Sequence, residues 1–224
     1  QTKKVTAFEA LMRWKHPERG FVPPSAFIPI AEETGLIVQI GEWALRQACC
    51  DAMKWPPDIS VSVNLSPLQF LKGNLTATVM NALATSGLDA SRLELEITES
   101  VLLDKTERNI KILNQLRDLG ARISMDDFGT GYSSIGYLRN FRFDKIKIDQ
   151  SFVRDVLIDE GSLAIVRAIA GLGASFGMTT TAEGVETEAQ MRRLNLEGCV
   201  EAQGYLYSEP IPVDEVALFL DQLS

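Results

Sequence analysis

Two adjacent carboxylates are the most chemically suggestive feature of this 224-residue sequence. Asp126 and Asp127 open the run Asp-Asp-Phe-Gly-Thr-Gly-Tyr-Ser-Ser, which ends at Ser134. Two carboxylates at close range do not both ionise cheaply without a cation, and the end of a strand lets both point at one. Gly129 and Gly131 make the following loop pliable. Taken alone, the run could instead be a structural Asx turn, so a cation site needs support from other residues.

That support comes from polar side chains on alternate positions of short apolar segments. Side chains alternate between the two faces of a strand, so each segment has one apolar and one polar face. The polar positions include Asn64, Glu96, Asp126, Lys147 and Glu183. A solvated sheet face is the simpler alternative, but parallel strands are covered on both faces, and buried carboxylates then need a partner or a metal. The pattern favours a site at the carboxyl ends of parallel strands.

The elements that must position these residues alternate between strand and helix. Seven strands are expected, at 5–14, 60–65, 93–98, 122–126, 145–149, 179–183 and 200–203. Helices are expected at 38–54, 104–119, 162–176 and 213–223, with another that begins near Thr187 and ends at Gly198. Capping boxes are expected for the pairs Asp104/Glu107 and Thr187/Gln190. This alternation predicts an α/β fold with parallel strands and right-handed crossovers.

Two architectures fit such an alternation. A closed (β/α)8 barrel needs eight strands, so with seven expected one strand would be missing upstream or hidden. An open doubly wound sheet is the rival, but its usual phosphate loop, Gly-x-Gly-x-x-Gly after the first strand, is absent.

Composition excludes several other chemistries. His16 is the only histidine, so a zinc site of two or three histidines is impossible, and a Ser-His-Asp triad would need a histidine that lies in a turn region. Cys49, Cys50 and Cys199 suit neither a disulfide framework nor a zinc knuckle, and reduced thiols in a cytoplasmic protein are expected. The net charge of −8 argues against a nucleic-acid polymer as ligand. No apolar stretch reaches the roughly 18 residues of a membrane span, so no membrane contact by this domain is expected.

Several motifs, in order along essentially the whole chain, resemble those of the EAL family of cyclic di-GMP phosphodiesterases. They are Phe8-Glu9-Ala10-Leu11-Met12-Arg13-Trp14, Val63-Asn64-Leu65-Ser66, Glu94-Leu95-Glu96-Ile97-Thr98-Glu99, Asp126-Asp127-Phe128-Gly129, Lys145-Ile146-Lys147-Ile148-Asp149, Ala182-Glu183-Gly184-Val185-Glu186 and Gln203-Gly204-Tyr205. The resemblance implies a TIM-like (β/α)8 barrel. It also implies a bacterial signal-transduction enzyme that hydrolyses one phosphodiester bond of cyclic di-GMP to linear pGpG.

The resemblance also implies a role for each matching residue. Two Mg²⁺ or Mn²⁺ ions would be held by Glu9, Asn64, Glu96, Asp126, Asp127 and Glu183. The catalytic residues would be Lys147, Glu183 and Glu99, and Glu99 would hold the loop from Asp127 to Ser134. Arg13 and Gln203 would bind the substrate, and Glu186 is a weaker candidate for supporting Glu183. All-oxygen ligands do select Mg²⁺ or Mn²⁺ over zinc, and a lysine supplies positive charge where a phosphoryl group gains negative charge.

Simpler roles stay open for several of these residues. Glu9 and Arg13 could form a surface ion pair, and Glu96 and Lys147 could form a salt bridge inside the barrel. The three tryptophans are expected in the core. The whole chain could also be a non-catalytic cyclic di-GMP receptor, or, more distantly, a lyase with a Schiff-base lysine in an apolar pocket.

The resemblance also sets expectations for the whole protein. Residues 1–224 would be a single EAL domain, N-terminally incomplete, because family members normally carry a further strand with a Tyr-Gln-Pro-type motif before the EAL segment. The domain would be a piece of a longer protein with upstream sensory or cyclase-like domains, which could anchor it in a membrane. A homodimer is possible.

Overall fold

The structure, a computed structural model, describes residues 4–103, 107–130, 138 and 141–223. It divides into two compact units. The first contains Gln1–Glu96, Thr106–Arg122 and Pro212–Ser224, and the second contains Ile97–Lys105 and Ile123–Ile211. The expected helix start at Asp104 and the segment from Gly131 to Ser134 lie outside the described residues.

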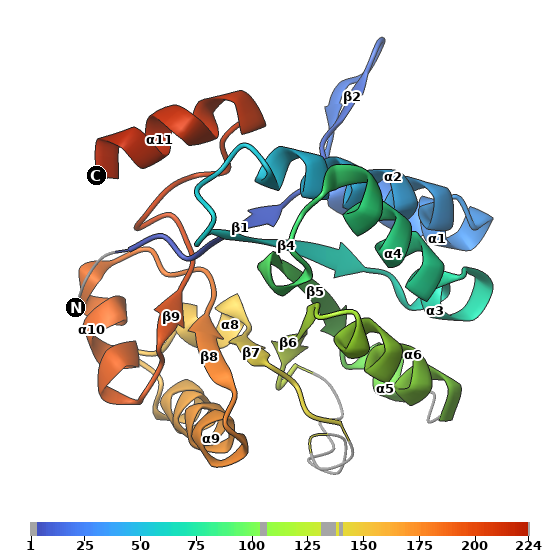
Figure 1. The fold of residues 1–224 in the computed structure, drawn as a ribbon. Helices are drawn as coiled ribbons and strands as arrows, with labels where there is room; N and C mark the ends of the chain where they lie inside the picture. Colours follow the sequence, from blue (N-terminus) through green and yellow to red (C-terminus); the bar gives the residue numbers. More distant parts are fainter. Residues whose placement is uncertain (1–3, 104–106, 131–137, 139–140, 224) are drawn as a thin grey trace. The chain divides into compact units, whose positions relative to one another are not determined.

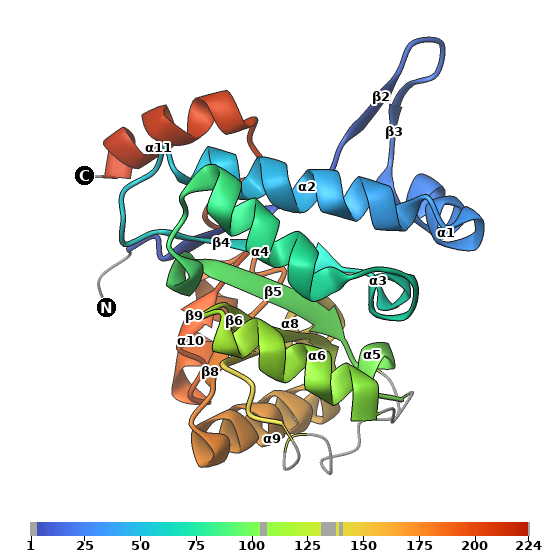
Figure 2. The same ribbon diagram turned by 45° about the vertical axis from the view of Figure 1, so that its right-hand side comes forward.

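The first unit is built on parallel strands with amphipathic helices packed against them. Its strands are β1 (Ala7–Ala10), β4 (Ser60–Leu65) and β5 (Leu93–Thr98), which are neighbours in that order, and the last two residues of β5 belong to the second unit. Its helices are α1 (Pro24–Thr34), α2 (Ile37–Ala52), α3 (Pro67–Lys72), α4 (Leu75–Ser86), α6 (Glu107–Asp118) and α11 (Val216–Leu223), with 3-10 turns η1 (Ala90–Arg92) and η2 (Val213–Glu215). Helices α2 and α4 lie side by side (Figures 1 and 2). Leu45 of α2 and Val61 of β4 are fully buried in its core.

The front of the first unit differs from the prediction. The expected strand 5–14 ends at Ala10, and a separate antiparallel hairpin follows, formed by β2 (Trp14–His16) and β3 (Gly20–Val22) (Figure 2). The Nδ1 atom of His16 accepts hydrogen bonds from the backbone N–H groups of Glu18 and Arg19, at 3.1 and 3.2 Å. The only histidine therefore shapes a turn, because its ring replaces backbone acceptors at the hairpin tip.

The prediction that all three tryptophans lie in the core was wrong for two of them. Trp14 and Trp43 are exposed. Trp55 is partly buried and contacts the Phe8 ring, with centroids 5.1 Å apart.

The second unit repeats the alternation of strand and helix. Its strands β6 (Arg122–Phe128), β7 (Lys145–Ile148), β8 (Thr179–Ala182) and β9 (Glu201–Ala202) pair in parallel in that order. Its helices are α5 (Ser100–Leu103), α8 (Gln150–Arg154), α9 (Glu160–Phe176) and α10 (Glu188–Leu196). Ile146 and Ile148 of β7 are fully buried, so the apolar positions predicted from alternation do form the core.

Helix α9 approaches the sheet closely. It begins at Asp159, whose carboxylate accepts a hydrogen bond from the Ser162 N–H at 2.6 Å, and it ends at Gly177 in the left-handed region. A Cβ atom at Gly173 would lie 2.4 Å from the Thr180 hydroxyl of β8. Glycine at this position lets the helix backbone lie directly against the strand.

The observed elements confirm the predicted α/β class, with parallel strands joined by helices. Among the described residues, no helix combines the length and the apolar character needed to cross a membrane.

Candidate metal centre and active site

Three carboxylates of the second unit form an acidic cluster. Asp126 and Asp127 stand near the end of β6, and Glu183 directly follows β8. Each offers an oxygen atom, and these atoms all lie within 4.8 Å of one another. Asp126 is buried, Glu183 is half-buried and Asp127 is exposed. A set of carboxylate oxygens with access from solvent is the donor set that Mg²⁺ and Mn²⁺ prefer, so these residues fit a hard divalent cation.

A β-bulge explains why two consecutive residues of one strand reach the same cluster. Neighbouring residues normally point to opposite faces. The pairing of β6 with β7 shifts register between Met125 and Phe128, and Asp127 has a φ of 53°, a left-handed conformation that side chains other than glycine rarely adopt. The Asp127 N–H also donates to the Asp126 carboxylate at 3.0 Å. The local backbone therefore turns both carboxylates toward one place.

Lys147 of β7 is ion-paired with two members of the cluster. Its side chain is only 2% exposed. The Nζ atom lies 2.7 Å from the Glu183 carboxylate and 3.3 Å from that of Asp126. A buried ammonium group is tolerated when opposite charges surround it, and here one partner comes from the neighbouring strand β6 and the other from the residue that follows β8.

Electrostatic repulsion remains at Asp127. Loss of solvent around its carboxylate, then the negative charges of Asp126 and Asp149, raise the pKa of Asp127, and Lys147 opposes the rise. Asp127 as a whole is exposed, so its pKa is raised by the surroundings of the carboxylate group and not by burial of the entire residue. A bound divalent cation would favour the ionised form of all these groups.

Glu99 lies next to the start of the loop that follows β6. Its carboxylate accepts a hydrogen bond from the Gly129 N–H at 3.0 Å. Gly129 has a φ of 99°, and a Cβ atom there would lie 3.1 Å from the Phe152 ring. The role expected for Glu99 in holding the loop stays a prediction, since the segment from Gly131 to Ser134 is outside the described residues.

In the first unit, the structure brings Glu9 and Asn64 together. The Asn64 amide nitrogen donates to the Glu9 carboxylate at 2.7 Å, across the parallel pair β1 and β4. The Asn64 amide oxygen is then the atom that suits a cation. Glu96 of β5 is buried, with 2% of its surface exposed. Arg13 is exposed, and its guanidinium donates to the Met12 carbonyl at 3.0 Å.

Gln203 and Glu186 of the second unit border the loop that carries Glu183. The Gln203 N–H donates to the Ala182 carbonyl at 2.8 Å, and its carbonyl accepts from the Val185 N–H at 3.0 Å. Glu186 is exposed, and its backbone N–H donates to the side chain of Gln190 at 2.9 Å. Gln203 therefore lies beside the loop that carries Glu183, and its role in binding substrate stays a prediction.

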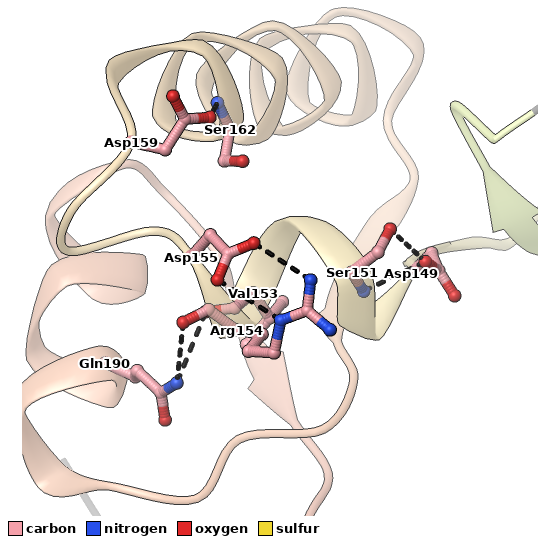
Figure 3. A network of polar contacts seen from close by, with 8 residues as sticks. All are labelled: Asp149, Ser151, Val153, Arg154, Asp155, Asp159, Ser162 and Gln190. Atoms are coloured by element: carbon pink, nitrogen blue, oxygen red, sulfur yellow. Dashed lines mark hydrogen bonds and ion pairs between the residues drawn. The ribbon is translucent and has the colours of Figure 1, made fainter.

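Sequence reasoning missed the part that Asp149 takes in the site. It caps helix α8, accepting from the Ser151 N–H at 2.9 Å and also from the Ser151 hydroxyl (Figure 3). Its charge also contributes to the raised pKa of Asp127. The signal was available, because an aspartate at a strand end with a serine two residues on is a typical helix N-cap.

The fold and the site define an α/β protein with an acidic, oxygen-donor centre at the ends of parallel strands. The chain matches the model of the EAL domain family over residues 1–210. It belongs to the EAL family, as its motifs predicted.

Two relatives show how much of a longer protein the chain matches. It is 56% identical over 224 residues to an uncharacterized Sinorhizobium fredii protein, y4lL, covering 100% of this chain and 27% of that protein. It is 45% identical over 212 residues to the Pseudomonas aeruginosa bifunctional diguanylate cyclase/cyclic di-GMP phosphodiesterase MucR, covering 93% of this chain and 31% of that protein. The chain thus spans less than a third of either relative.

Solved structures confirm the predicted TIM-like fold of the EAL type. The PaMucR phosphodiesterase in complex with c-di-GMP aligns with a TM-score of 0.92 at 43% identity, over 96% of this chain and 89% of that one. Klebsiella pneumoniae BlrP1 with manganese and cyclic di-GMP aligns with a TM-score of 0.81 at 32% identity, over 93% of this chain and 52% of that one.

Proposed function

We propose that this chain is a phosphodiesterase that opens one phosphodiester bond of cyclic di-GMP to give linear pGpG, dependent on two Mg²⁺ or Mn²⁺ ions. The observation that carries the proposal is the cluster of Asp126, Asp127 and Glu183, with Lys147 bonded to two of its members. The relative MucR, whose name includes cyclic di-GMP phosphodiesterase, supports the substrate. The manganese complex of BlrP1 supports the kind of ion.

In this proposal the ions are held by Glu9, Asn64, Glu96, Asp126, Asp127 and Glu183. When bound, two such ions would activate the attacking water and stabilise the charge that develops on the phosphate. The chain's own contribution is to hold the oxygen atoms of these side chains in fixed positions. Arg13 and Gln203 would bind the substrate, since both are exposed side chains that can donate hydrogen bonds to phosphate or base.

Lys147 would stabilise negative charge during the reaction. Its ammonium group is a buried cation that keeps three donor hydrogens beside the carboxylates of Asp126 and Glu183. A fixed positive charge in a site with little water acts strongly on a phosphoryl group that gains negative charge. Glu99 would keep the loop that begins at Gly129 in its working shape.

The experiment is turnover of cyclic di-GMP, followed by chromatography, with Mg²⁺ or Mn²⁺ present. Wild type and Glu42→Ala should give the linear dinucleotide, because Glu42 is exposed and pairs with Arg46 one turn along the same helix. Glu9→Ala should give none. Intact substrate after incubation with wild type, together with calorimetric binding, would overturn hydrolysis in favour of a cyclic di-GMP receptor.

The setting of the domain is also a proposal. A single EAL domain at 1–224, upstream sensory or cyclase-like domains, a homodimer and a cytoplasmic location all follow from the family resemblance. The name of MucR, which combines a diguanylate cyclase with a phosphodiesterase, supports a cyclase-like neighbour.

A further inference from the structure

The loop that carries Glu183 is enclosed by neighbouring backbone. A Cβ atom at Gly184, where φ is 65°, would lie 2.6 Å from the Gln150 Cβ atom at the start of α8. A Cβ atom at Gly204 would lie 2.3 Å from the backbone of Val185. The loop therefore lies directly against α8 on one side and the chain after β9 on the other.

One buried side chain, Gln190 in the first turn of α10, organises the far end of this loop. Its Oε1 atom accepts the backbone N–H groups of Glu186 and Thr187, each at 2.9 Å. The backbone N–H of Gln190 donates to the Thr187 hydroxyl at 3.2 Å, which completes the capping box that the sequence predicted. This part of the arrangement starts the helix and needs only an oxygen acceptor at position 190.

The nitrogen of the same amide makes a second connection. The Nε2 atom donates to the carbonyls of Val153 and Arg154, at 3.4 Å each, in the last turn of α8 (Figure 3). Carbonyls at a helix end lack partners within the helix, so this long, shared hydrogen bond gives the Arg154 carbonyl a donor and adds to the Val156 N–H that the Val153 carbonyl already accepts at 3.3 Å. Gln190 is 6% exposed, and water has little access to replace it.

These contacts connect Lys147 to Glu183 through a continuous series of bonded segments. Lys147 lies on β7, which leads through the Asp149 cap into α8. The end of α8 is tied to Gln190, and Gln190 is tied to the loop that follows Glu183. The path ends at the 2.7 Å ion pair between Glu183 and Lys147.

We propose that Gln190 is a positioning residue, which fixes Glu183 relative to Lys147 by joining α10 and its preceding loop to α8. The effect on turnover rests on the proposed phosphodiesterase activity, whereas the effect on the geometry of the carboxylate does not. The amide is suited to this task because it offers an acceptor to one segment and a donor to the other.

Two substitutions distinguish the role of the Gln190 side-chain oxygen, which accepts hydrogen bonds, from that of its nitrogen, which donates them. Gln190→Glu keeps an oxygen for the Glu186 and Thr187 N–H groups, since glutamate is a standard residue of the capping box, but it has no N–H for α8. Gln190→Ala removes both. We expect Gln190→Glu to melt below wild type, because the α8 carbonyls lose their donor, but well above Gln190→Ala, while its kcat falls about tenfold at unchanged KM.

A second measurement does not depend on activity. Mn²⁺ binding by calorimetry should weaken several-fold in Gln190→Glu, since Glu183 would be less well placed toward Asp126 and Asp127. The matched control is Arg154→Ala, because the Arg154 side chain is 74% exposed and pairs with Asp155 at the surface. Its kcat and Mn²⁺ affinity should equal those of wild type.

The outcomes are distinct. If wild type itself does not hydrolyse cyclic di-GMP, the proposed function fails, and the Mn²⁺ comparison alone decides the positioning role. Wild-type kcat and Mn²⁺ affinity in Gln190→Glu would overturn that role. So would losses accompanied by a fall in Tm as large as that of Gln190→Ala, because Gln190 would then act only through helix capping and packing.

Discussion

The ammonium group of Lys147 and the carboxylate of Glu183 lie 2.7 Å apart, although Lys147 stands on β7 and Glu183 directly follows the neighbouring strand β8. Lys147 is paired in register with Thr181 of β8, and Glu183 follows two residues later, where its N–H bonds to the Ile148 carbonyl at 3.1 Å. The parallel register therefore sets the contact, and the burial of Lys147 makes it strong. Changes to this pair should affect both folding and turnover.

Lys147→Met should lower kcat by about 10²–10³-fold, the usual effect of removing one charge-stabilising group from an active site. It should also lower the Tm of the metal-free protein, because Asp126 and Glu183 would lose the cation between them. Steady-state kinetics and thermal denaturation in EDTA measure the two effects.

The control is Lys145→Met on the same strand. Lys145 pairs with Glu201 at 2.8 Å, outside the acidic cluster. Its loss should lower the Tm and leave most of the turnover. Equal losses of turnover in the two variants would show that Lys147 acts through folding alone.

Glu99→Ala should slow turnover at least about tenfold and destabilise the protein by about 1–3 kcal/mol, because the Gly129 N–H loses its acceptor. Glu99→Gln keeps an oxygen acceptor and should lie close to wild type in stability. Chemical denaturation with kinetics on the same samples checks the pair. Unchanged kinetics in Glu99→Ala would contradict a role for Glu99 in the loop.

The strands that alternate cleanly could be predicted from the sequence. The predicted bounds of β4 and β5 agree with the structure, and β7 and β8 differ by one residue, because the alternation of apolar and polar residues directly reports a strand with one buried face. The hairpin β2–β3 could not be predicted this way, since its turn is closed by the His16 ring and its Trp14 is exposed. The residue pattern predicts one continuous strand over 5–14, and a large apolar side chain such as that of Trp14 is expected in the core.

The site was predictable in its residue types and not in its geometry. Alternation alone places Asp126 and Asp127 on opposite faces. Both are expected to point at one cation from the end of the strand, but the backbone features that bring them together, the register shift of β6 and the positive φ of Asp127, have no signal in the sequence. Gln190 was recognised as a capping residue, because local spacing encodes the capping box. Its bond to α8 joins residues 37 positions apart, and such contacts depend on packing that no local pattern shows.

Asp127→Asn should stabilise the metal-free protein and abolish its stabilisation by Mn²⁺. The pKa of Asp127 is raised, so its ionisation is unfavourable in the folded chain and opposes folding at neutral pH. The amide removes that charge, and Tm should rise by roughly 2–4 °C for each kcal/mol of repulsion relieved. Thermal denaturation with EDTA and with Mn²⁺ tests this. A lower Tm of the variant in EDTA would show that Asp127 makes a favourable contact instead.

Ca²⁺ should inhibit turnover that Mg²⁺ or Mn²⁺ supports. Ca²⁺ is larger and accepts looser coordination, so it would bind the carboxylates of Asp126 and Glu183 without the tight geometry that the reaction needs. Initial rates in each ion, and in mixtures at fixed Mg²⁺, measure the effect. Equal rates in Ca²⁺ and Mg²⁺ would refute it.

Cys49 and Cys199 should resist alkylation until the protein unfolds. Burial, with a smaller contribution from Cys50, raises the pKa of Cys49 from 9.0 to about 12, and burial with the charge of Glu197 raises the pKa of Cys199 to about 11. Since the thiolate is the reactive form, both thiols should be unreactive at pH 8. Iodoacetamide labelling followed by mass spectrometry, with and without denaturant, checks this.

The same two thiols should contribute to alkaline unfolding. Below pH 9 they are protonated in both states and the stability difference is complete, whereas above it the unfolded thiols ionise first and stability falls until the folded pKa values are reached. Cys49→Ala should therefore show a shallower loss of Tm between pH 9 and 11 than wild type, even if its Tm at pH 7 is lower because a buried sulfur is gone. Parallel slopes in the two proteins would mean that Cys49 ionises in the folded state as readily as in the unfolded chain, and that its burial does not control its chemistry.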